Sequence, residues 1–320
     1  MRVMRGEKSD GETSVKKAVL SLAWLWWLAV AGLLALRWVN IGGVVPMLQS
    51  GLPLVGMSLL VLLVLVAAMR EKLLVLMTVL LLVPMVVLAR PWWFQGVQQP
   101  SAASDIVVVA SNMKFGAADV DDVGRLVSEK QADALVLLEI TPEALARIEA
   151  SGIPEMLPHR SGRPREDAGG TMIFTKEPHE ERVDSPVARF DQVAVEIERP
   201  SADPWLLLGA HPVPPTASSW AAELANLQAW RDRQDDEIPL VMAGDFNASS
   251  AHPSFRGLKR GMTDAQRATG PGWVRTWPQG SAIPAFVDLD HVLFRGLEVV
   301  TSGVSVIGNT DHAAVWARLG

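Results

Sequence analysis

The sequence predicts an α/β domain that follows three transmembrane helices. The first ninety residues contain three uncharged apolar runs, and each is long enough to cross a bilayer, which needs about 20 apolar residues. The rest of the chain alternates short apolar runs, typical of buried strands, with amphipathic helical patterns. Several strand-like runs end in a polar residue, and residues 238–248 (IPLVMAGDFNA) are the clearest example.

Charge is distributed unevenly along the chain. Residues 1–103 contain 9 Lys and Arg and 4 Asp and Glu, whereas residues 104–320 contain 20 basic and 31 acidic residues, a net charge of −11. This acidity disfavours broad, non-specific binding to a nucleic-acid backbone, because that affinity depends on Lys and Arg. The chain has no cysteine, so disulfides and thiolate metal sites are excluded.

The three apolar runs cover residues 18–36, 52–69 and 73–89. The first could also be read as a signal peptide, because Lys16 and Lys17 precede it. However, it is longer than the usual core of about 7–15 residues, and two further runs follow it. Membrane helices therefore explain the region better.

Basic residues predict the orientation of these helices. Five precede the first run and two lie in the turn 70–72, whereas the first loop and the segment after the third run have one each. The positive-inside rule then places the N-terminus in the cytoplasm and the C-terminal domain outside the plasma membrane. Trp92, Trp93 and Phe94 would lie at the outer interface. The expected organisation is a cytoplasmic tail (1–17), a membrane anchor (18–90), a linker (91–103) and an α/β domain (104–320).

The α/β domain is predicted to begin with two strand–helix units. Residues 105–110 form a buried strand pattern that leads to Asn112, and residues 134–138 form a second one that leads to Glu139. A helix with an acidic first turn should follow the first strand, and one with a first-turn proline should follow the second. Residues 154–170, rich in Pro, Gly and Arg, are expected to form a loop.

Further strands are predicted at 170–175, 192–197, 205–209, 238–243, 286–294 and 313–319. Residues 192–197 alternate as a half-exposed strand should. Residues 219–233 predict a helix with one apolar face. Gly244 would let the backbone turn after the strand that precedes it, and the period of two would point Asp245 and Asn247 the same way.

Polar residues with metal-binding, acid–base or hydrogen-bonding chemistry follow the predicted strands: Asn112, Glu139, His211, Asp245, Asn247, Asp290, Asp311 and His312. Taken singly, each also has a structural explanation, such as a turn residue, a helix-capping acid, a packed loop histidine or an Asx-turn. Asp290 lies within an apolar strand, so its carboxylate is expected to have a partner. Their joint occurrence at strand ends favours a functional site.

Together these side chains suit the hydrolysis of a phosphate ester. Carboxylates bind Mg²⁺ through oxygen, and the ion neutralises charge on the phosphate. A histidine oriented by a carboxylate can act as a base or as a cationic contact to the phosphate. The sequence has neither Gly-x-Ser-x-Gly nor Gly-x-x-x-x-Gly-Lys, so it does not indicate a serine hydrolase or a P-loop.

Five short motifs carry a family resemblance: residues 138–139 (LE), 210–215 (AHPVPP), 244–248 (GDFNA), 289–293 (LDHVL) and 310–312 (TDH). Their order resembles that of the endonuclease/exonuclease/phosphatase superfamily, and the resemblance extends over about residues 104–320. It implies the deoxyribonuclease-I-like fold, a four-layer α/β sandwich.

The resemblance also implies a role for each candidate residue. Glu139 and Asn112 would lie at the metal, Mg²⁺ or alternatively Mn²⁺, and Asp311 would orient the site or touch a second metal ion.

The remaining candidates would act on the phosphate. Asp245 would position or activate water, with Asn247 and His211 in contact with the phosphate. Asp290 and His312 would form a pair for acid–base chemistry or phosphate stabilisation.

Thr276 and Trp277 resemble the substrate-side Thr-Trp element of the family. The sequence departs from the family pattern in three places. It has no tyrosine, it lacks the arginine that often precedes the Asp290 motif, and Thr310 replaces the more usual serine. These departures are expected to affect the choice of substrate and the rate of hydrolysis more than the fold.

We therefore expect a membrane-anchored, Mg²⁺-dependent hydrolase of the phosphodiesterase or nuclease type. A nuclease would need a basic groove beside the site, whereas a phospholipid headgroup phosphoesterase would need apolar residues on the rim, and Trp273 and Trp277 weakly favour the second. A non-catalytic binding protein on the same fold should lack a ligand, and none is missing. A transporter would need ionisable residues inside the apolar runs, which contain none. No protein partner is implied.

Overall fold

The computed structural model describes residues 3–93, 99–200, 203–269 and 272–320. The chain divides into two compact units, of which the first contains Met1–Val39 and Met47–Arg90 and the second contains Asn40–Pro46 and Pro91–Gly320. Phe94 and residues 95–98 of the predicted linker lie outside the described residues.

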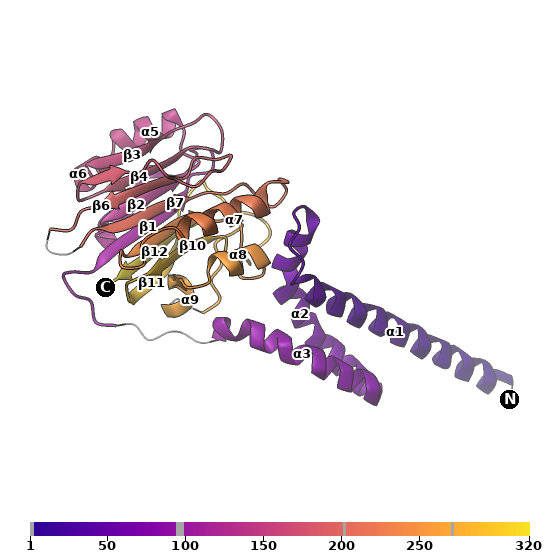
Figure 1. Cartoon of the computed structure of the whole chain (residues 1–320). Coiled ribbons are helices and arrows are strands. Elements are labelled where there is room, and N and C mark those ends of the chain that lie inside the picture. The colour runs from indigo at the N-terminus through magenta and orange to yellow at the C-terminus, as the bar shows by residue number, and fades with distance from the viewer. Residues whose placement is uncertain (1–2, 94–98, 201–202, 270–271) are drawn as a thin grey trace. The chain divides into compact units, whose positions relative to one another are not determined.

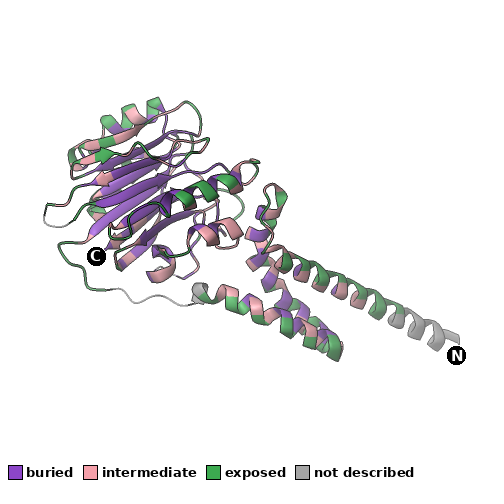
Figure 2. Cartoon of the chain, viewed as in Figure 1, coloured by how far each residue is buried: buried purple, intermediate pink, exposed green. Residues whose placement is uncertain are grey.

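The first unit consists of three apolar helices, α1 (Val3–Leu36), α2 (Val44–Ala68) and α3 (Lys72–Trp93) (Figure 1). Each contains a stretch long and apolar enough to cross a membrane, as the sequence predicts. α2 begins earlier than the predicted run and contains Pro53, which membrane helices tolerate. Many large apolar side chains of these helices are exposed (Figure 2), as expected for a surface that would face lipid.

The second unit is built on two six-stranded sheets. Sheet A has the order β11 (Val299–Val306), β12 (Ala313–Leu319), β1 (Ile106–Asn112), β2 (Ala134–Leu138), β4 (Thr171–Thr175) and β3 (His159–Arg163). Sheet B has the order β5 (His179–Glu181), β6 (Val193–Ile197), β7 (Trp205–Ala210), β8 (Leu240–Asp245), β10 (Asp290–Arg295) and β9 (Thr263–Asp264). Most strand pairs are antiparallel, but β1 and β2 are parallel, as are β7 and β8.

Helices cover the outer faces of both sheets. The helices α4 (Val120–Lys130), α5 (Pro142–Glu149) and α6 (Ile153–Met156) pack on sheet A. The helices α7 (Trp220–Arg231) and α8 (Pro253–Leu258) pack on sheet B, and the short α9 (Ala265–Thr269) lies beside β10 and β11. The side chain of Asp119 caps α4 by accepting two backbone N–H groups of its first turn, and the Thr141 hydroxyl caps α5 by accepting one.

The four layers follow from where the apolar side chains of the strands point. One core lies between the sheets and includes Val108, Val136, Leu207, Val241 and Val292. Alternate residues of the same strands face the helices on either side, so strands are buried on both faces (Figure 2). The predicted four-layer α/β sandwich is confirmed.

Three local predictions are wrong. Residues 154–170 are not wholly loop, because they contain the end of α6 and the strand β3, whose polar residues 159–163 pair with β4 at the edge of the sheet and show no apolar pattern. Residues 192–197 are mostly buried, since β6 is covered on both faces. The strand predicted at 286–294 begins only at Asp290.

The topology brings several strand ends to one end of the sandwich. Parallel pairing aligns the ends of β1 and β2 and the ends of β7 and β8. Antiparallel pairing sets Asp290, the first residue of β10, opposite Asp245, the last residue of β8. Across the sandwich, β1 packs against β8 and β10. Residues far apart in sequence therefore meet at this end.

Gly244 determines how closely β7 and β8 approach each other. It lies within β8 with φ +144°, and an added Cβ would lie only 2.3 Å from the carbonyl oxygen of Ala210 in β7. Only glycine fits this position. The sequence predicts a turn at Gly244, but the chain leaves the strand one residue later, after Asp245.

Candidate active site

Six of the predicted side chains lie at this end of the sandwich. Asn112 is the last residue of β1, Asp245 is the last residue of β8, and Asp290 is the first residue of β10. Glu139 and His211 directly follow β2 and β7, and His312 directly precedes β12. Most are almost completely buried, with Asn112 and Asp245 each 1% exposed. Hydrogen bonds and ion-pair distances below 4 Å link all six.

Asn112 connects the two sheets through its side-chain amide. Its Nδ2 donates to Glu139 Oε1 at 3.0 Å and to Asp245 Oδ2 at 3.1 Å. Burial raises the pKa of Glu139, and the hydrogen bonds from Asn112 and Phe115 oppose this. Burial also raises the pKa of Asp245, and the charge of His312 opposes it. Two carboxylates thus lie on either side of one donor group.

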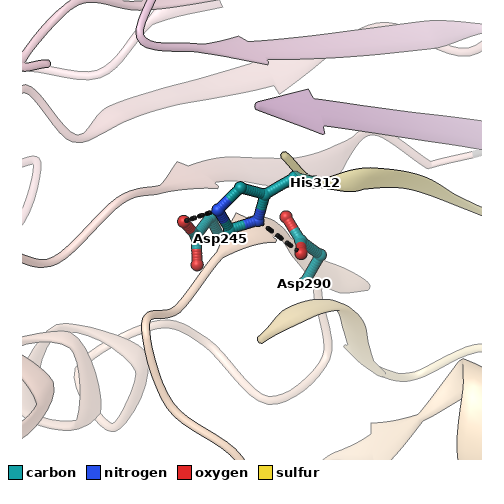
Figure 3. A group of neighbouring side chains, drawn as sticks. All are labelled: Asp245, Asp290 and His312. Carbon is teal, nitrogen blue, oxygen red and sulfur yellow. Dashed lines mark hydrogen bonds and ion pairs between the residues drawn. The ribbon is translucent and has the colours of Figure 1, made fainter. Parts of the chain in front are cut away.

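His312 lies between two carboxylates (Figure 3). Its Nδ1 is 2.9 Å from Asp290 Oδ2, and its Nε2 is 3.6 Å from Asp245 Oδ2. Burial alone would lower the pKa of His312, but the charges of Asp290 and Asp245 outweigh it and raise the pKa to about 10. At neutral pH the ring is therefore a cation, and Asp290 has the partner that its burial requires.

His211 differs from His312 in its charge state. Its Nε2 lies 3.9 Å from both Glu139 Oε1 and Asp245 Oδ2, and its ring packs against Phe190 at 4.8 Å between centroids. Burial lowers the pKa of His211 to about 4, so the ring is neutral. The Ala168 backbone weakly favours the charged ring, yet neither ring nitrogen has a hydrogen bond of ordinary geometry within the described residues. Such a buried orphan group indicates a missing partner.

Asn247 lies beside the cluster, but not for the predicted reason. It follows the strand and has a left-handed backbone with φ 47°, so the strand period does not set its direction. Its backbone N–H donates to Asp245 Oδ1 at 2.8 Å, which is an Asx-turn, and its Nδ2 donates to the Pro212 carbonyl at 2.9 Å. Asn247 thus ties Asp245 to the segment that follows His211.

Asp311 is half-buried at the edge of the cluster. Its carbonyl oxygen accepts a hydrogen bond from the Gln279 N–H, and its negative charge helps to raise the pKa of His312. Within the described residues its carboxylate makes no hydrogen bond or ion pair below 4 Å to another site residue. Its influence on the site is electrostatic in this structure.

Thr276 and Trp277 differ in their access to a substrate. Thr276 is fully buried, and its Oγ1 accepts the backbone N–H groups of Leu289 at 2.9 Å and Asp290 at 3.2 Å. It therefore holds the start of β10 and positions Asp290. Trp277 is half-buried and packs edge-to-face on Phe286 at 6.3 Å.

Some supporting residues were not predicted as part of the site. Gln192 forms hydrogen bonds with both the backbone N–H and the carbonyl of His211, and Thr310 accepts the His312 N–H and donates to the Asn112 carbonyl. Thr310 stands within the family motif, so its sequence position could have indicated it. Gln192 has no such signal, because its contact with His211 depends on the pairing of β6 and β7.

The donor set fits a hard divalent cation. Asn112 brings the carboxylates of Glu139 and Asp245 together with a carboxamide, and oxygen ligands of these kinds are the ones that Mg²⁺ prefers. Asp245, Asp290 and His312 also lie close enough to hold an ion. That second arrangement suits Mg²⁺ less well, because His312 is a cation paired with both carboxylates.

The second unit is a four-layer α/β sandwich with carboxylates, carboxamides and histidines gathered at its strand ends. The chain belongs to the endonuclease/exonuclease/phosphatase family, whose sequence profile matches residues 109–312. Members of this family generally hydrolyse phosphate esters. No curated protein matches the chain.

Solved structures share the fold at low sequence identity. An endonuclease/exonuclease/phosphatase from Beutenbergia cavernae is 17% identical with a TM-score of 0.51, over 68% of this chain and 71% of the other. TDP2 from D. rerio, in complex with a single-stranded DNA product, is 12% identical with a TM-score of 0.56, over 68% and 99%. A beta toxin from Staphylococcus aureus is 14% identical with a TM-score of 0.51, over 66% and 99%. At these identities the likeness concerns the fold alone.

Proposed function

We propose that this chain is a membrane-anchored, Mg²⁺-dependent phosphodiesterase. The position of the Asp245 carboxylate carries the proposal. Its Oδ2 is 3.1 Å from Asn112 Nδ2, on the side suited to a metal ion, and 3.6 Å from His312 Nε2, on the side suited to charge stabilisation and proton transfer. Hydrolysis of a phosphate ester at neutral pH needs both kinds of group around one reacting centre.

Glu139 would hold the metal ion together with the carboxamide of Asn112. When bound, Mg²⁺ would neutralise negative charge on the phosphate and make phosphorus more electrophilic. Mn²⁺ has similar ligand preferences and is expected to substitute. The buried setting of the two carboxylates strengthens their attraction for a cation.

Asp245 would position the attacking water and accept its proton. Burial raises the pKa of this carboxyl group, which makes it a stronger base than an exposed aspartate. His312, held as a cation by Asp290, would contact the phosphate oxygens as negative charge develops on them. Thr276 would act as a positioning residue for Asp290.

His211 and Asn247 would orient the phosphate. A neutral imidazole can donate one hydrogen bond, and the ring nitrogens of His211 have no partner of ordinary geometry within the described residues. Asn247 forms hydrogen bonds with Asp245 and with the Pro212 carbonyl, so it holds the segment after β8 against the segment after β7. Asp311 would tune the charge of His312, and Trp277 would contribute to the substrate-side rim.

Removal of the metal ion is expected to stop turnover. The purified full chain in detergent should hydrolyse bis-p-nitrophenyl phosphate with Mg²⁺, lose essentially all activity in EDTA, and recover it when Mg²⁺ or Mn²⁺ is added in excess. Release of p-nitrophenol measures this directly. Equal activity with and without EDTA would contradict the metal assignment. A folded protein inactive on every diester tested would instead indicate a binding protein on this fold.

The domain that carries the site is proposed to lie outside the plasma membrane, with the N-terminus in the cytoplasm. The basic residues of the tail and of the turn 70–72 support this orientation. A membrane-impermeant reagent applied to intact cells should label a cysteine introduced after Gly320, because the chain has no other cysteine. Labelling only after the cells are opened would show that the C-terminal domain lies in the cytoplasm, and it would contradict the proposed orientation.

A further inference from the structure

A strained turn, residues 114–116, follows β1 directly beside the candidate active site. Lys114 (φ 46°), Phe115 (φ 51°) and Gly116 (φ 74°) are all in the left-handed region. For a bulky residue such as phenylalanine this conformation is unusual, and it persists only where the surroundings hold it in place. Backbone outliers of this kind cluster at functional sites.

The catalytic side chains themselves hold the turn in place. The Lys114 N–H donates to Asn112 Oδ1 at 2.8 Å, and the Phe115 N–H donates to Glu139 Oε2 at 2.9 Å. Arg147 donates to the Gly116 carbonyl, and an added Cβ on Gly116 would lie 2.5 Å from Thr141 Oγ1. The position of Phe115 is therefore coupled to the carboxylate that would hold the metal.

Phe115 projects an apolar ring from this turn into solvent. Phe115 is 61% exposed, and the other Phe and Trp residues among the described residues after residue 98 are buried or half-buried. Because its nitrogen is 2.9 Å from Glu139 Oε2, its Cα lies within about 4 Å of that oxygen. The exposed ring therefore starts from a backbone position beside the carboxylate that would hold the metal.

We propose that Phe115 packs against the glycerol and acyl region of a membrane phospholipid, with Lys114 next to its phosphate. This inference deepens the proposed function and rests on it. Water would form the new bond to phosphorus, one ester P–O bond would break, and the proton would pass to the departing alkoxide. The products are a phosphomonoester and an alcohol.

Charge and tethering favour a phospholipid over nucleic acid. Residues 104–320 carry 20 basic and 31 acidic residues, which opposes a long polyanion but not a single phosphodiester. Proteins that bind single strands usually combine several stacking rings with a basic groove, and Phe115 is a single exposed ring. The three membrane helices of the same chain keep the domain near a bilayer.

The experiment compares a lipid with its deacylated counterpart. The full chain, reconstituted in vesicles of phosphatidylethanolamine and phosphatidylglycerol, is assayed by ³¹P NMR for conversion of phosphodiester to phosphomonoester, with water-soluble glycerophosphoethanolamine as the matched substrate. Phe115→Ala should lower the ratio of lipid to soluble kcat/KM about ten-fold, because the ring contributes only where acyl chains are present. Phe115→Leu should restore most of the ratio, because it restores apolar volume.

Control variants and substrates separate the possible failures. Val183→Ala, at an exposed apolar residue beyond β5, should leave the ratio unchanged. An unchanged ratio in Phe115→Ala, with Mg²⁺-dependent turnover intact, overturns this inference alone. The wild type could instead prefer single-stranded DNA to the vesicles, with Phe115→Leu as impaired as Phe115→Ala. That result would assign the ring to base stacking and overturn the lipid assignment. Absence of turnover on every diester would overturn the proposed function itself.

Discussion

Asp245→Asn and His312→Gln are each expected to lower kcat/KM for bis-p-nitrophenyl phosphate by about 10³-fold or more. Asparagine keeps the shape of Asp245 but cannot accept the proton of the attacking water, and it removes the negative charge shared by the metal side and the histidine side. Glutamine at 312 removes the cation that Asp290 holds next to the reacting phosphate. Steady-state rates at saturating Mg²⁺ measure both effects.

The pH dependence of Tm gives a second test of the charge on His312. The pKa of His312 is raised from its ordinary value of 6.5 to about 10, so its ionic contacts stabilise the fold fully below pH 6.5 and lose that contribution as pH rises through about 10. In EDTA, the Tm of wild type should therefore fall across this window, and the fall should be smaller in His312→Gln. His179→Gln, at the edge strand β5, should change neither activity nor this pH dependence. Either site variant retaining near-wild-type kcat/KM would refute the assignment.

Glu139→Gln is expected to weaken Mg²⁺ binding by about 100-fold or more and to lower the rate at low Mg²⁺ by a similar factor. The carboxylate is the acid on the sheet A side of the proposed metal position, and the amide of glutamine has no negative charge to attract the ion. Isothermal titration with Mg²⁺ and the Mg²⁺ concentration for half-maximal activity measure the two effects independently.

The stability of Glu139→Gln separates lost metal binding from lost folding. Burial raises the pKa of Glu139, so its ionised form disfavours the folded state. Glutamine removes that charge but keeps only one of the two oxygens that accept from Asn112 and Phe115, so the two effects oppose each other and Tm in EDTA should change little. Mg²⁺ should raise the Tm of wild type but not of the variant. Glu143→Gln, in the first turn of α5, is the matched control. If Mg²⁺ raises the Tm of Glu139→Gln as much as that of wild type, the ion lies elsewhere, for example at Asp245, Asp290 and His312.

Several elements could be predicted from the sequence because their signals are local. The apolar runs 106–110 and 134–138 form buried strands, and the helices that follow them have the expected acidic first turn and first-turn proline. The three apolar helices also follow from length and composition. Elements held mainly by pairing were missed, such as β11 and the polar edge strand β3, since backbone pairing with a neighbour leaves no apolar period in the sequence.

Local patterns in the sequence indicate the family and the polar residues at the strand ends. Which of those residues meet, and in what charge state, depends on how the whole domain packs. Asn112 reaches Asp245 across 133 positions in the chain, and this contact depends on how two sheets stack. The sequence does not distinguish His211 from His312, yet burial outweighs the charge of Asp245 and keeps His211 neutral, whereas Asp290 and Asp245 make His312 a cation. Charge state depends on neighbours in space, and those neighbours are set by the packing of the whole domain.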